Sequence, residues 1–411
     1  MLFECCPEVN RIMIKRPMNR RTFLSRSACV GAATSLPGIA HAAESPLSKH
    51  RIERVEFRTV SVPWPRQVGR NSRGGIHGNG PTRLRVCVLH TNRGATGWGQ
   101  TQGKTGTPEQ LLKLVKGKSV AELIDPATGI RSEKYHAIDI PLHDLAGVIL
   151  DQPVWAMTGA KKPHLTKVYS GMIYFDDLDP VENPAGIDKV LENCRWDYDY
   201  GYRQFKVKIG RGNKWMPAKA GLKRDIDVVN AIHKAFPDVE ILVDGNNGFT
   251  VDTMIGFLKG IADVPLFWIE EPFHETVADW TRLSDYLVAN GRKETLRADG
   301  EAKPDFPVLE ELQQDHTLNV RLEDICGHGF TRWRQQMPRL TKEGIGVSPH
   351  TWGTALKTVY TAHFVGAYGN APTIEGVTTK GGDVDFGENR VVDAQFRPSN
   401  QPGFGLSLPV Q

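Results

Sequence analysis

Two short apolar runs, each ending on a carboxylate, constrain the fold of this chain more than any other feature. Residues 240–243 end on Asp244, and residues 266–269 end on Glu270, 26 positions further along. Unbroken apolar runs separated by a helix-length segment are typical of parallel strands buried on both faces. The carboxyl ends of such strands lie at one edge of the sheet, where α/β proteins carry their chemistry. We therefore expect the two carboxylates, one βα unit apart, to share a site.

Polar strand ends of this kind recur through the C-terminal half of the chain. The intervals between them are about 23 to 30 residues, the length of a βα unit, and the ends are Asp244, Glu270, Asp299–Glu301, Glu323–Asp324, His350 and Glu375. Successive right-handed βα units either wind an open sheet or close into a barrel. The regular series favours a barrel, and no strand is followed by a GxGxxG or Walker motif. We expect an α/β barrel of the TIM type over residues 166–384.

Residues 1–43 have the pattern of an export leader. Residues 19–24 (Asn-Arg-Arg-Thr-Phe-Leu) form a twin-arginine signature, a mildly apolar stretch follows at 28–40, and residues 40–42 (Ala-His-Ala) fit a cleavage site. We expect a twin-arginine signal peptide and a periplasmic or exported protein; the alternative is an ordinary frayed N-terminus, and Met18 is an alternative start. No stretch approaches the roughly 20 apolar residues of a membrane span.

The charge outside the leader argues against a nucleic-acid-binding protein. The whole chain has a formal net charge of +4, and residues 1–43 hold six Lys or Arg side chains and two acids, so the remainder is close to neutral. It contains no basic stripe with interleaved aromatic side chains. The cysteines outside the leader, Cys87, Cys194 and Cys326, are widely spaced and odd in number. This arrangement argues against a disulfide framework or a CxxC metal site.

A second domain is expected before the barrel. About 365 residues follow the leader, more than one hydrophobic core usually supports. Residues 51–62 and 84–90 alternate apolar and polar side chains, as half-buried strands do, and helical segments follow them. We predict an α+β domain over residues 50–165, with the C-terminal segment 385–411 packing back against it.

The glycine-rich loop 67–81 contains or adjoins four basic side chains, Arg66, Arg70, Arg73 and His77. Its composition predicts a mobile, exposed, cationic segment. Such a loop is either a solvated connector or a lid over an anionic ligand, and both interpretations stay open. Under the second interpretation, Arg73 and His77 are candidate substrate-binding residues.

Three consecutive βα units each supply a carboxylate: Asp244, Glu270 and either Glu301 or Asp299. Converging carboxylates without a cation repel one another. A hard divalent ion explains such a cluster, and Mg²⁺ binds carboxylate oxygens while leaving room for water or substrate. Each acid alone is as readily explained by a helix cap or a surface charge. The regular recurrence of the three favours a metal site.

Two lysines and a histidine are candidate bases beside this cluster. Lys206 and Lys208 share one face of an otherwise apolar strand, and buried lysines are rare unless they are paired. Burial and a nearby cation lower the pKa of a lysine, which makes it a usable base near neutral pH. His350 follows a later strand, and a preceding carboxylate, Glu323 or Asp324, would orient its imidazole as a second base.

A divalent ion between two bases predicts removal of a proton next to a carboxylate. A general base contributes about 10²–10⁴-fold, or roughly 3–5 kcal/mol, whereas enzymes lower barriers by about 8–23 kcal/mol. The remainder must come mainly from stabilising the charge of an enediolate, which a bound divalent ion supplies.

Taken in order, these motifs resemble the enolase superfamily, specifically the mandelate racemase/muconate lactonizing enzyme group. The resemblance covers nearly the whole chain after the leader. Gln100 replaces an acid of the family pattern in the first motif. The matching segments are residues 94–100 (Gly-Ala-Thr-Gly-Trp-Gly-Gln), 142–147 (Leu-His-Asp-Leu-Ala-Gly), 205–210 (Phe-Lys-Val-Lys-Ile-Gly), 243–246 (Val-Asp-Gly-Asn), 268–272 (Trp-Ile-Glu-Glu-Pro), 348–350 (Ser-Pro-His) and 402–405 (Pro-Gly-Phe-Gly).

This resemblance implies a (β/α)7β modified TIM barrel with an α+β capping domain, one Mg²⁺ ion and a homo-oligomer. Counting back from Gly329 places Glu323 at the position that orients the histidine, with Asp324 as its neighbour. The implied roles are metal binding by Asp244, Glu270 and Glu301 (Asp299 as the alternative), proton transfer by Lys208 and His350, contact with the substrate carboxylate by Lys206, substrate binding by Asn246 and enediolate stabilisation by Glu375.

The resemblance favours a Mg²⁺-dependent acid-sugar dehydratase that forms a 2-keto-3-deoxy acid. A racemase, epimerase or cycloisomerase would use the same enediolate and is the first alternative. The altered acid after the sixth strand motivates a second alternative, a non-catalytic exported protein that binds sugar acids. In each case the expected ligand is a small-molecule carboxylate or acid sugar.

Overall fold

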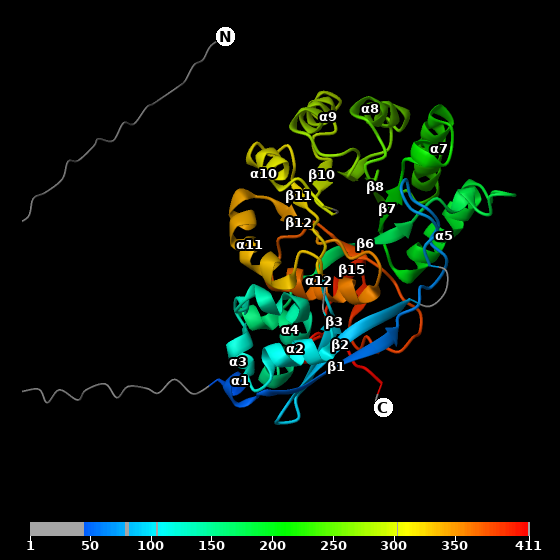
Figure 1. The fold of residues 1–411 in the computed structure, drawn as a ribbon. Helices are drawn as coiled ribbons and strands as arrows, with labels where there is room; N and C mark the ends of the chain where they lie inside the picture. The colour runs from blue at the N-terminus through cyan, green and yellow to red at the C-terminus, as the bar shows by residue number, and fades with distance from the viewer. Residues whose placement is uncertain (1–44, 79–81, 104–105, 302, 410–411) are drawn as a thin grey trace, which may run out of the picture. The chain divides into compact units, whose positions relative to one another are not determined.

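The computed structural model describes residues 45–78, 82–103, 106–301 and 303–409 (Figure 1). The predicted leader, residues 1–43, lies outside the described residues. Among the residues that the structure describes, no helix combines the length and the apolar character needed to cross a membrane. Residues from Glu44 onward belong to one compact unit by their contacts.

The N-terminal part contains the two strands expected from its alternating sequence. β1 (Ile52–Ser61), β2 (Arg83–Thr91) and β3 (Thr96–Gln100) form an antiparallel sheet in that order. Helix α4 (Asp139–Leu150) lies directly on β3, because a Cβ atom at Gly97 would be 2.4 Å from the backbone of Leu145. The smaller elements of this part are α1 (Pro46–Lys49), α2 (Pro108–Val115), α3 (Val120–Leu123), β4 (Ile124–Asp125), β5 (Gly129–Ile130), η1 (Glu133–Ile138) and η2 (Val154–Thr158).

The following part contains the predicted barrel. Its parallel strands are β6 (Thr166–Ile173), β7 (Gln204–Lys208), β8 (Glu240–Asp244), β9 (Leu266–Glu270), β10 (Leu296–Asp299), β11 (Val320–Arg321), β12 (Gly346–Val347) and β13 (Ile374–Gly376). They pair in sequence order from β6 to β12, and β13 pairs with β6, which returns the sheet to its first strand. Across the remaining seam, the Val347 N–H donates to the Asn370 carbonyl at 3.0 Å. The α/β barrel prediction is therefore confirmed.

Helices follow the strands and cover the outside of the barrel (Figure 1). They are η3 (Asp176–Leu178), α5 (Ile187–Tyr200), α6 (Arg211–Lys214), α7 (Ala218–Ala235), α8 (Val251–Gly260), α9 (Val277–Ala289), α10 (Phe306–Gln314), α11 (Phe330–Glu343) and α12 (Ala355–Tyr368). Helix α7 shows why they dock there: its buried face carries Val228, Val229 and Ile232. Apolar residues at such helical spacing pack against the outward side chains of the strands.

Side-chain alternation along the strands separates the barrel interior from the helix layer. One small cluster joins every second residue of neighbouring strands: Tyr169, Leu242, Trp268, Ala298, Val320 and Leu322. Residues of the opposite parity, such as Ile241 and Ile269, belong to the large core shared with the helices. Since alternate residues of a strand face the same side, positions 244, 270 and 324 continue the interior series. Polar residues at these positions are thereby directed to the mouth of the barrel.

The C-terminal segment contacts both parts of the chain. β14 (Arg390–Val392) and β15 (Gln395–Arg397) form a hairpin, and β15 pairs antiparallel with β6. Further on, the Phe404 N–H donates to Asp144 Oδ1 at 2.9 Å, and Trp155 Nε1 donates to the Ser399 carbonyl at 3.0 Å. Residues 385–409 thus lie against the region predicted as the capping domain as well as against the barrel.

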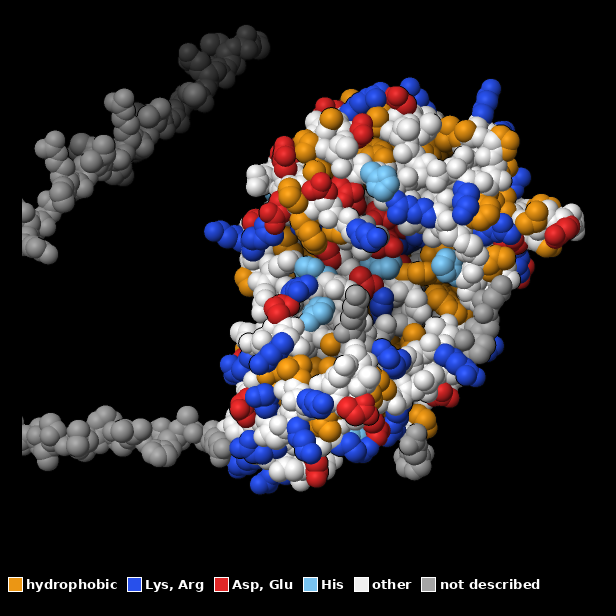
Figure 2. All heavy atoms as spheres, viewed as in Figure 1, with side chains coloured by type: hydrophobic (Ala, Val, Ile, Leu, Met, Phe, Trp, Pro, Cys, Tyr) orange, Lys and Arg blue, Asp and Glu red, His pale blue; other side chains and the backbone are white. Residues whose placement is uncertain are grey.

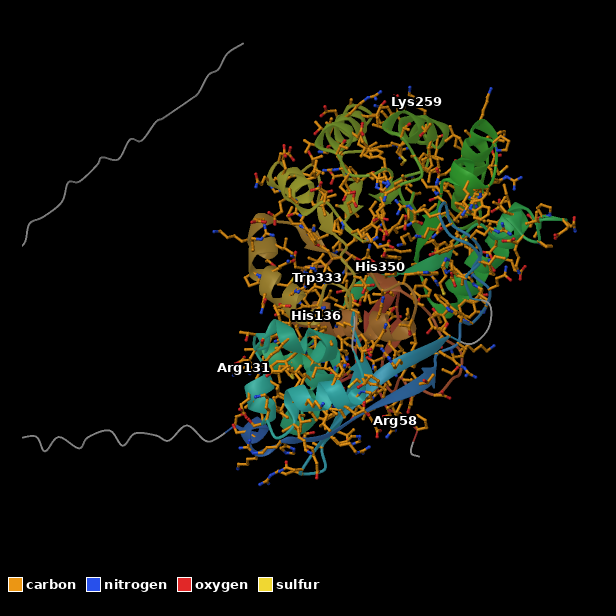
Figure 3. The ribbon with its side chains drawn as sticks, viewed as in Figure 1. Arg58, Arg131, His136, Lys259, Trp333 and His350 are labelled. Carbon is orange, nitrogen blue, oxygen red and sulfur yellow. The ribbon has the colours of Figure 1, made fainter. Side chains whose placement is uncertain are left out.

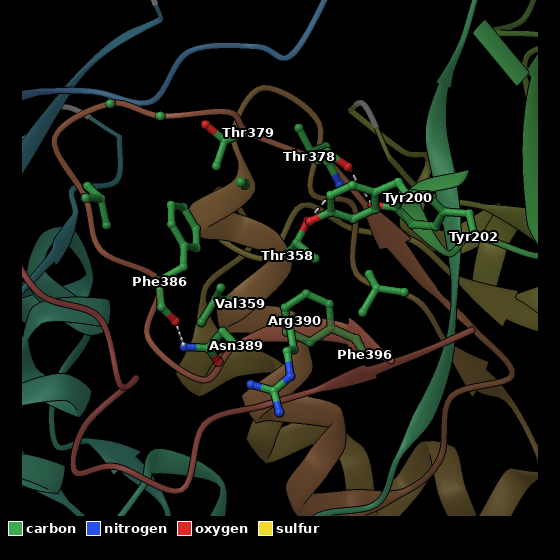
Figure 4. Close-up of a pocket in the computed structure, with 16 residues that line it drawn as sticks. Tyr200, Tyr202, Thr358, Val359, Thr378, Thr379, Phe386, Asn389, Arg390 and Phe396 are labelled. Atoms are coloured by element: carbon green, nitrogen blue, oxygen red, sulfur yellow. Dashed lines mark hydrogen bonds between the residues drawn. The ribbon is translucent and has the colours of Figure 1, made fainter. Parts of the chain in front are cut away.

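A cavity of about 280 Å³ lies between α12, the end of α5 and this segment (Figure 4). Its walls are largely aromatic and aliphatic, with Tyr202, Phe386 and Phe396 among them. The Tyr202 hydroxyl lies 2.9 Å from Thr378 Oγ1, and the Asn389 amide donates to the Phe386 carbonyl at 3.0 Å. These polar groups are therefore bonded within the protein, and the cavity is separate from the polar cluster at the strand ends.

Candidate active site

Three carboxylates from successive strand ends converge at the mouth of the barrel. Asp244 ends β8, Glu270 ends β9 and Glu301 follows β10, and each offers one oxygen within 4.8 Å of the others. Asp244 and Glu270 are opposite each other in the parallel register and are buried. Figure 2 shows acidic side chains and histidines gathered in the middle of the face that contains these strand ends. The structure thus brings together the three residues that were predicted to bind a metal.

The cluster fits a hard divalent ion. Glu270 Oε2 and Glu301 Oε2 are buried and have no hydrogen-bond partner among the described residues. Burial, and then the charge of Asp244, raise the pKa of Glu270 well above its usual range. A divalent cation would satisfy the free oxygens and offset the repulsion, and carboxylate oxygens are ligands that suit Mg²⁺.

Asp299, the alternative third ligand, points away from this cluster. It accepts hydrogen bonds from Trp280 Nε1 at 3.1 Å and from the Gly300 N–H at 2.7 Å. Burial, and then Glu275, raise the pKa of Asp299 to about 7. Because Ala298 belongs to the interior series, Asp299 has the opposite parity and faces the helix layer. The preference for Glu301 over Asp299 therefore agrees with the structure.

Both predicted lysines of β7 are buried beside the carboxylates. Lys206 Nζ lies 2.7 Å from Glu270 Oε1, 3.1 Å from Glu375 Oε1 and 3.2 Å from Asp244 Oδ2. Lys208 Nζ lies 2.5 Å from Asp244 Oδ2. Burial lowers the pKa of Lys206, but Glu270 and Glu375 outweigh it and raise the value well above the usual range. Lys206 is thus a fixed cation suited to binding a carboxylate.

His350, labelled in Figure 3, follows strand β12 and also contacts the cluster. Its Nε2 lies 3.1 Å from Glu301 Oε1, and its Nδ1 lies 3.0 Å from Asp324 Oδ2. Burial lowers the pKa of His350, but Glu301 and Asp324 outweigh it and raise the value to about 10. Both ring nitrogens of His350 therefore face carboxylates.

The expectation that Glu323 orients His350 is wrong, because the contact is made by Asp324. Glu323 forms a buried ion pair with Arg321, while Asp324 pairs with His350 across a parallel bridge. The physical reason is side-chain parity: Leu322 belongs to the interior series, so position 324 faces the site and position 323 does not. The cluster therefore keeps an aspartate beside its histidine.

Conservative substitutions of Asp324 and Glu323 are expected to affect different properties, catalysis in one case and stability in the other. Asp324→Asn is expected to lower kcat about 10- to 100-fold, the usual cost of losing a partner that orients an active-site group. Glu323→Gln should instead lower the melting temperature, because it weakens the buried pair with Arg321. Steady-state kinetics and thermal melting of both purified variants check this pair of effects. A larger loss of kcat for Glu323→Gln than for Asp324→Asn would contradict it.

Glu375 and Asn246 also lie at the strand ends. Glu375 Oε2 accepts from the Thr351 N–H at 2.7 Å, and Gly171 leaves room for this side chain, since a Cβ there would be 2.7 Å from Glu375 Oε1. Asn246 has a left-handed backbone with φ 41°, which asparagine tolerates better than most residues. Its Oδ1 is buried and has no partner within the described structure, so it is available to a ligand.

The predicted cationic lid is only partly borne out. Arg66 donates to Asp197 Oδ2 at 2.9 Å, and Arg70 forms a two-point pair with Asp179, the shortest contact being 2.6 Å. These pairs occupy both guanidinium groups, and the described part of the loop is anchored where Ser72 Oγ donates to the Gly245 carbonyl at 2.8 Å. The expectation of an exposed segment is therefore wrong for residues 68–72, which are buried or half-buried.

Arg73 and His77 retain a position suited to ligand contact. Arg73 is exposed and lies 3.4 Å from His274 Nε2. His77 packs edge-on against Tyr174 and Trp352, with ring centroids 5.5 Å apart in each case. Lys208 Nζ lies 5.2 Å from the centre of the Tyr174 ring, so His77 belongs to an aromatic wall beside the candidate base.

Sequence reasoning missed Tyr174, Trp352 and Lys357. Tyr174 and Trp352 follow strand ends, but aromatic residues there are too common to single out. Lys357 lies seven positions after His350, and its Nζ contacts Asp324 Oδ2 at 2.6 Å. No motif marks that lysine, because its role depends on a partner from another strand.

Comparison with known proteins identifies the family to which this barrel and its site belong. A sequence model of the family described as "Enolase C-terminal domain-like" matches residues 189–410. The structure is similar to galacturonate dehydratase from Geobacillus sp. complexed with D-galacturonate and 5-keto-4-deoxy-D-galacturonate, with a TM-score of 0.79, 29% identity, and coverage of 88% of this chain and 95% of that one. It is also similar to a mandelate racemase/muconate lactonizing protein from Geobacillus sp. complexed with magnesium/tartrate, with a TM-score of 0.78, 29% identity and coverage of 88% and 94%.

A curated relative extends the comparison to a different reaction. The 3,6-anhydro-alpha-L-galactonate cycloisomerase of Streptomyces coelicolor is 27% identical over 262 residues. This match spans 59% of the present chain and 64% of the relative, slightly less than two thirds of its length. On the family match and the shared barrel, the chain belongs to the enolase superfamily, in the group of mandelate racemase and muconate lactonizing enzymes.

Proposed function

We propose that this protein is a Mg²⁺-dependent acid-sugar dehydratase that forms the 2-keto-3-deoxy product. One observation carries the proposal: Lys208 and His350 approach a single carboxylate cluster from two sides. Lys208 contacts Asp244 at 2.5 Å and His350 contacts Glu301 at 3.1 Å. Oxygens of those two acids lie within 4.8 Å of each other, so one substrate carbon can lie between the two proton-transfer groups.

Asp244, Glu270 and Glu301 would hold the ion, which when bound supplies positive charge to an ionised substrate carboxylate. Lys206, as a fixed cation, binds and orients the same carboxylate. Lys208 removes the α-proton through its Nζ. His350 donates a proton from Nε2 to the β-hydroxyl, which leaves as water. The enol that remains gains a proton on the β-carbon and loses its hydroxyl proton to solvent, so the product is a 2-keto-3-deoxy acid.

The orientation of His350 supports dehydration. Asp324 contacts Nδ1 at 3.0 Å, so Nε2 is the nitrogen that faces the cluster and can deliver a proton to a leaving hydroxyl. The similar galacturonate dehydratase is named with a 5-keto-4-deoxy product. Counted from the carboxylate of a uronate, that keto group is on the α-carbon and the deoxy position is the β-carbon. This is the same change as in the proposed reaction.

A second candidate is an epimerase or cycloisomerase acting through the same enediolate. Its support is the pair of opposed groups, because a proton removed on one face and returned on the other inverts the α-carbon. The cycloisomerase of Streptomyces coelicolor also shares part of the chain. The reason for considering a non-catalytic binding protein was an altered acid beside His350. Asp324 supplies that acid, so this alternative has no remaining support.

Incubation with a library of aldonates, aldarates and uronates in D₂O with Mg²⁺ tests the proposal. Formation of a 2-keto-3-deoxy acid, detected by its reaction with semicarbazide and by NMR, is the expected outcome. Exchange of the α-proton for deuterium without a keto product would contradict dehydration and support the second candidate. Absence of both reactions across the library would contradict the proposed function as a whole. Light scattering of the same preparation tests the expected homo-oligomer.

Export through the twin-arginine route remains part of the proposal. It is supported by the order of charge, apolar stretch and small-residue site in residues 1–43. Replacing Arg20 and Arg21 together with lysine should leave the protein in the cytoplasm, because the signature is read by a receptor. Cell fractionation with immunoblotting measures this, and Arg26→Lys is the matched control. Periplasmic protein at the unchanged level in the double variant would contradict the proposal.

A further inference from the structure

Lys357 adds a third member to the Asp324–His350 pair. It lies in the first turn of α12, and its Nζ is 2.6 Å from Asp324 Oδ2 and 3.2 Å from the Trp352 carbonyl. The side chain is 13% exposed. The same Asp324 oxygen faces His350 Nδ1 at 3.0 Å, so one carboxylate oxygen joins a lysine to the imidazole.

The position of this lysine is unfavourable without a specific partner. A helix N-terminus carries partial positive charge, which opposes a cation in the first turn. The end of α12 is already capped, because Thr354 Oγ1 accepts from the Leu356 N–H at 3.3 Å. Burial lowers the pKa of Lys357, but Asp324 outweighs it and raises the value. The contact with Asp324 therefore offsets the costs of placing the ammonium group here.

The contacts around Asp324 divide between its two oxygens. Oδ1 accepts from the N–H groups of Cys326 at 2.9 Å and Gly327 at 2.7 Å. Oδ2 receives Lys357 and His350. The backbone contacts anchor one oxygen, while Lys357 and His350 share the other. Since a shift of about 1 Å at a reacting group can cost about 10²-fold in rate, the position of the shared oxygen matters for His350.

We propose that Lys357 is a positioning residue that acts through Asp324 to hold His350 Nε2 toward the reacting carbon. This inference rests on the proposed function and assigns no contact between Lys357 and the substrate. Its influence is confined to the His350 side of the site, because Lys208 pairs with Asp244 and not with Asp324. Loss of Lys357 should therefore impair the acid step and spare removal of the α-proton.

The test compares Lys357→Met and Lys357→Arg in the full-length protein loaded with Mg²⁺. Methionine keeps most of the volume but removes the charge, and arginine restores a cation that can reach the same oxygen. For Lys357→Met we expect kcat for dehydration to fall about 10- to 100-fold, with KM and α-proton exchange in D₂O close to wild type. Lys357→Arg should regain much of kcat. Lys223→Met, at an exposed lysine paired with Asp227, is the matched control.

Equal losses of dehydration and exchange, or a fall in melting temperature alone, would overturn the inference. A readout without substrate separates it from the proposed function. In proton NMR, the Nδ1–H of a carboxylate-bonded imidazole gives a downfield signal, and His350→Asn identifies the one that belongs to His350. That signal should weaken or shift in Lys357→Met and return in Lys357→Arg. An unchanged signal would overturn the positioning role even if no acid sugar reacts with the wild-type protein.

Discussion

Lys208→Ala is expected to lower kcat for dehydration by about 10²–10⁴-fold, the contribution of a positioned general base. The lysine is buried at the end of β7, with its Nζ 2.5 Å from Asp244. Alanine removes the amine that is proposed to accept the α-proton. Lys206 stays 3.2 Å from Asp244, so the acid keeps one cationic neighbour and the fold should persist.

Two measurements separate this loss from a loss of structure. Exchange of the α-proton in D₂O should disappear together with product formation, while the affinity for the acid sugar, measured by calorimetry, changes little. Lys223→Ala is the matched control, because that lysine is exposed and pairs with Asp227 on the surface of α7. Exchange that survives in Lys208→Ala would show that another group removes the proton.

Glu270→Gln is expected to abolish the response of the protein to Mg²⁺. The amide keeps an oxygen for Lys206, which lies 2.7 Å from Glu270 Oε1, but it removes one of three negative charges from the cluster. Less repulsion should leave the metal-free variant at least as thermostable as the wild type. Wild-type protein should gain about 2.7 kcal/mol at a Mg²⁺ concentration near 100 times its Kd, and the variant should gain none.

Thermal melting with and without Mg²⁺, after treatment with a chelator, measures this difference. Dehydratase activity should vanish on chelation and return with Mg²⁺ only in the wild type. Glu310→Gln, at an exposed acid on α10 paired with Arg339 at 3.4 Å, is the matched control. A variant that still melts higher in Mg²⁺ would exclude Glu270 as a ligand.

The strand ends were readable from the sequence because apolar runs and polar ends repeat at the length of a βα unit. Asp244, Glu270 and His350 were found in this way. The choice between Glu323 and Asp324 was also readable, although the motif spacing favoured the wrong residue. Val320 and Leu322 are apolar and in phase with Asp324, so parity along the strand gives the observed contact.

Other parts of the site depend on contacts between distant segments. Local composition left Arg66 and Arg70 in a loop that was either a solvated connector or a lid, yet their partners, Asp197 and Asp179, lie more than 100 residues later. A cation that is paired in the fold and one that awaits a ligand look the same in a sequence. Lys357 was missed for the same reason, because its importance comes from Asp324, 33 positions earlier.

The hydrogen bond from the Phe404 N–H to Asp144 has a consequence for how the protein is made. These residues are separated by 260 positions, and burial raises the pKa of Asp144 to about 7 despite this bond and the one from Trp98. During translation, helix α4, which contains Asp144, is synthesised long before Phe404. The N–H group of Phe404 becomes available only when almost the entire polypeptide has been made. The hydrogen bond from Phe404 to Asp144 can therefore form only late in synthesis, and a chain truncated before Phe404 would lack one of the two N–H donors to this acid.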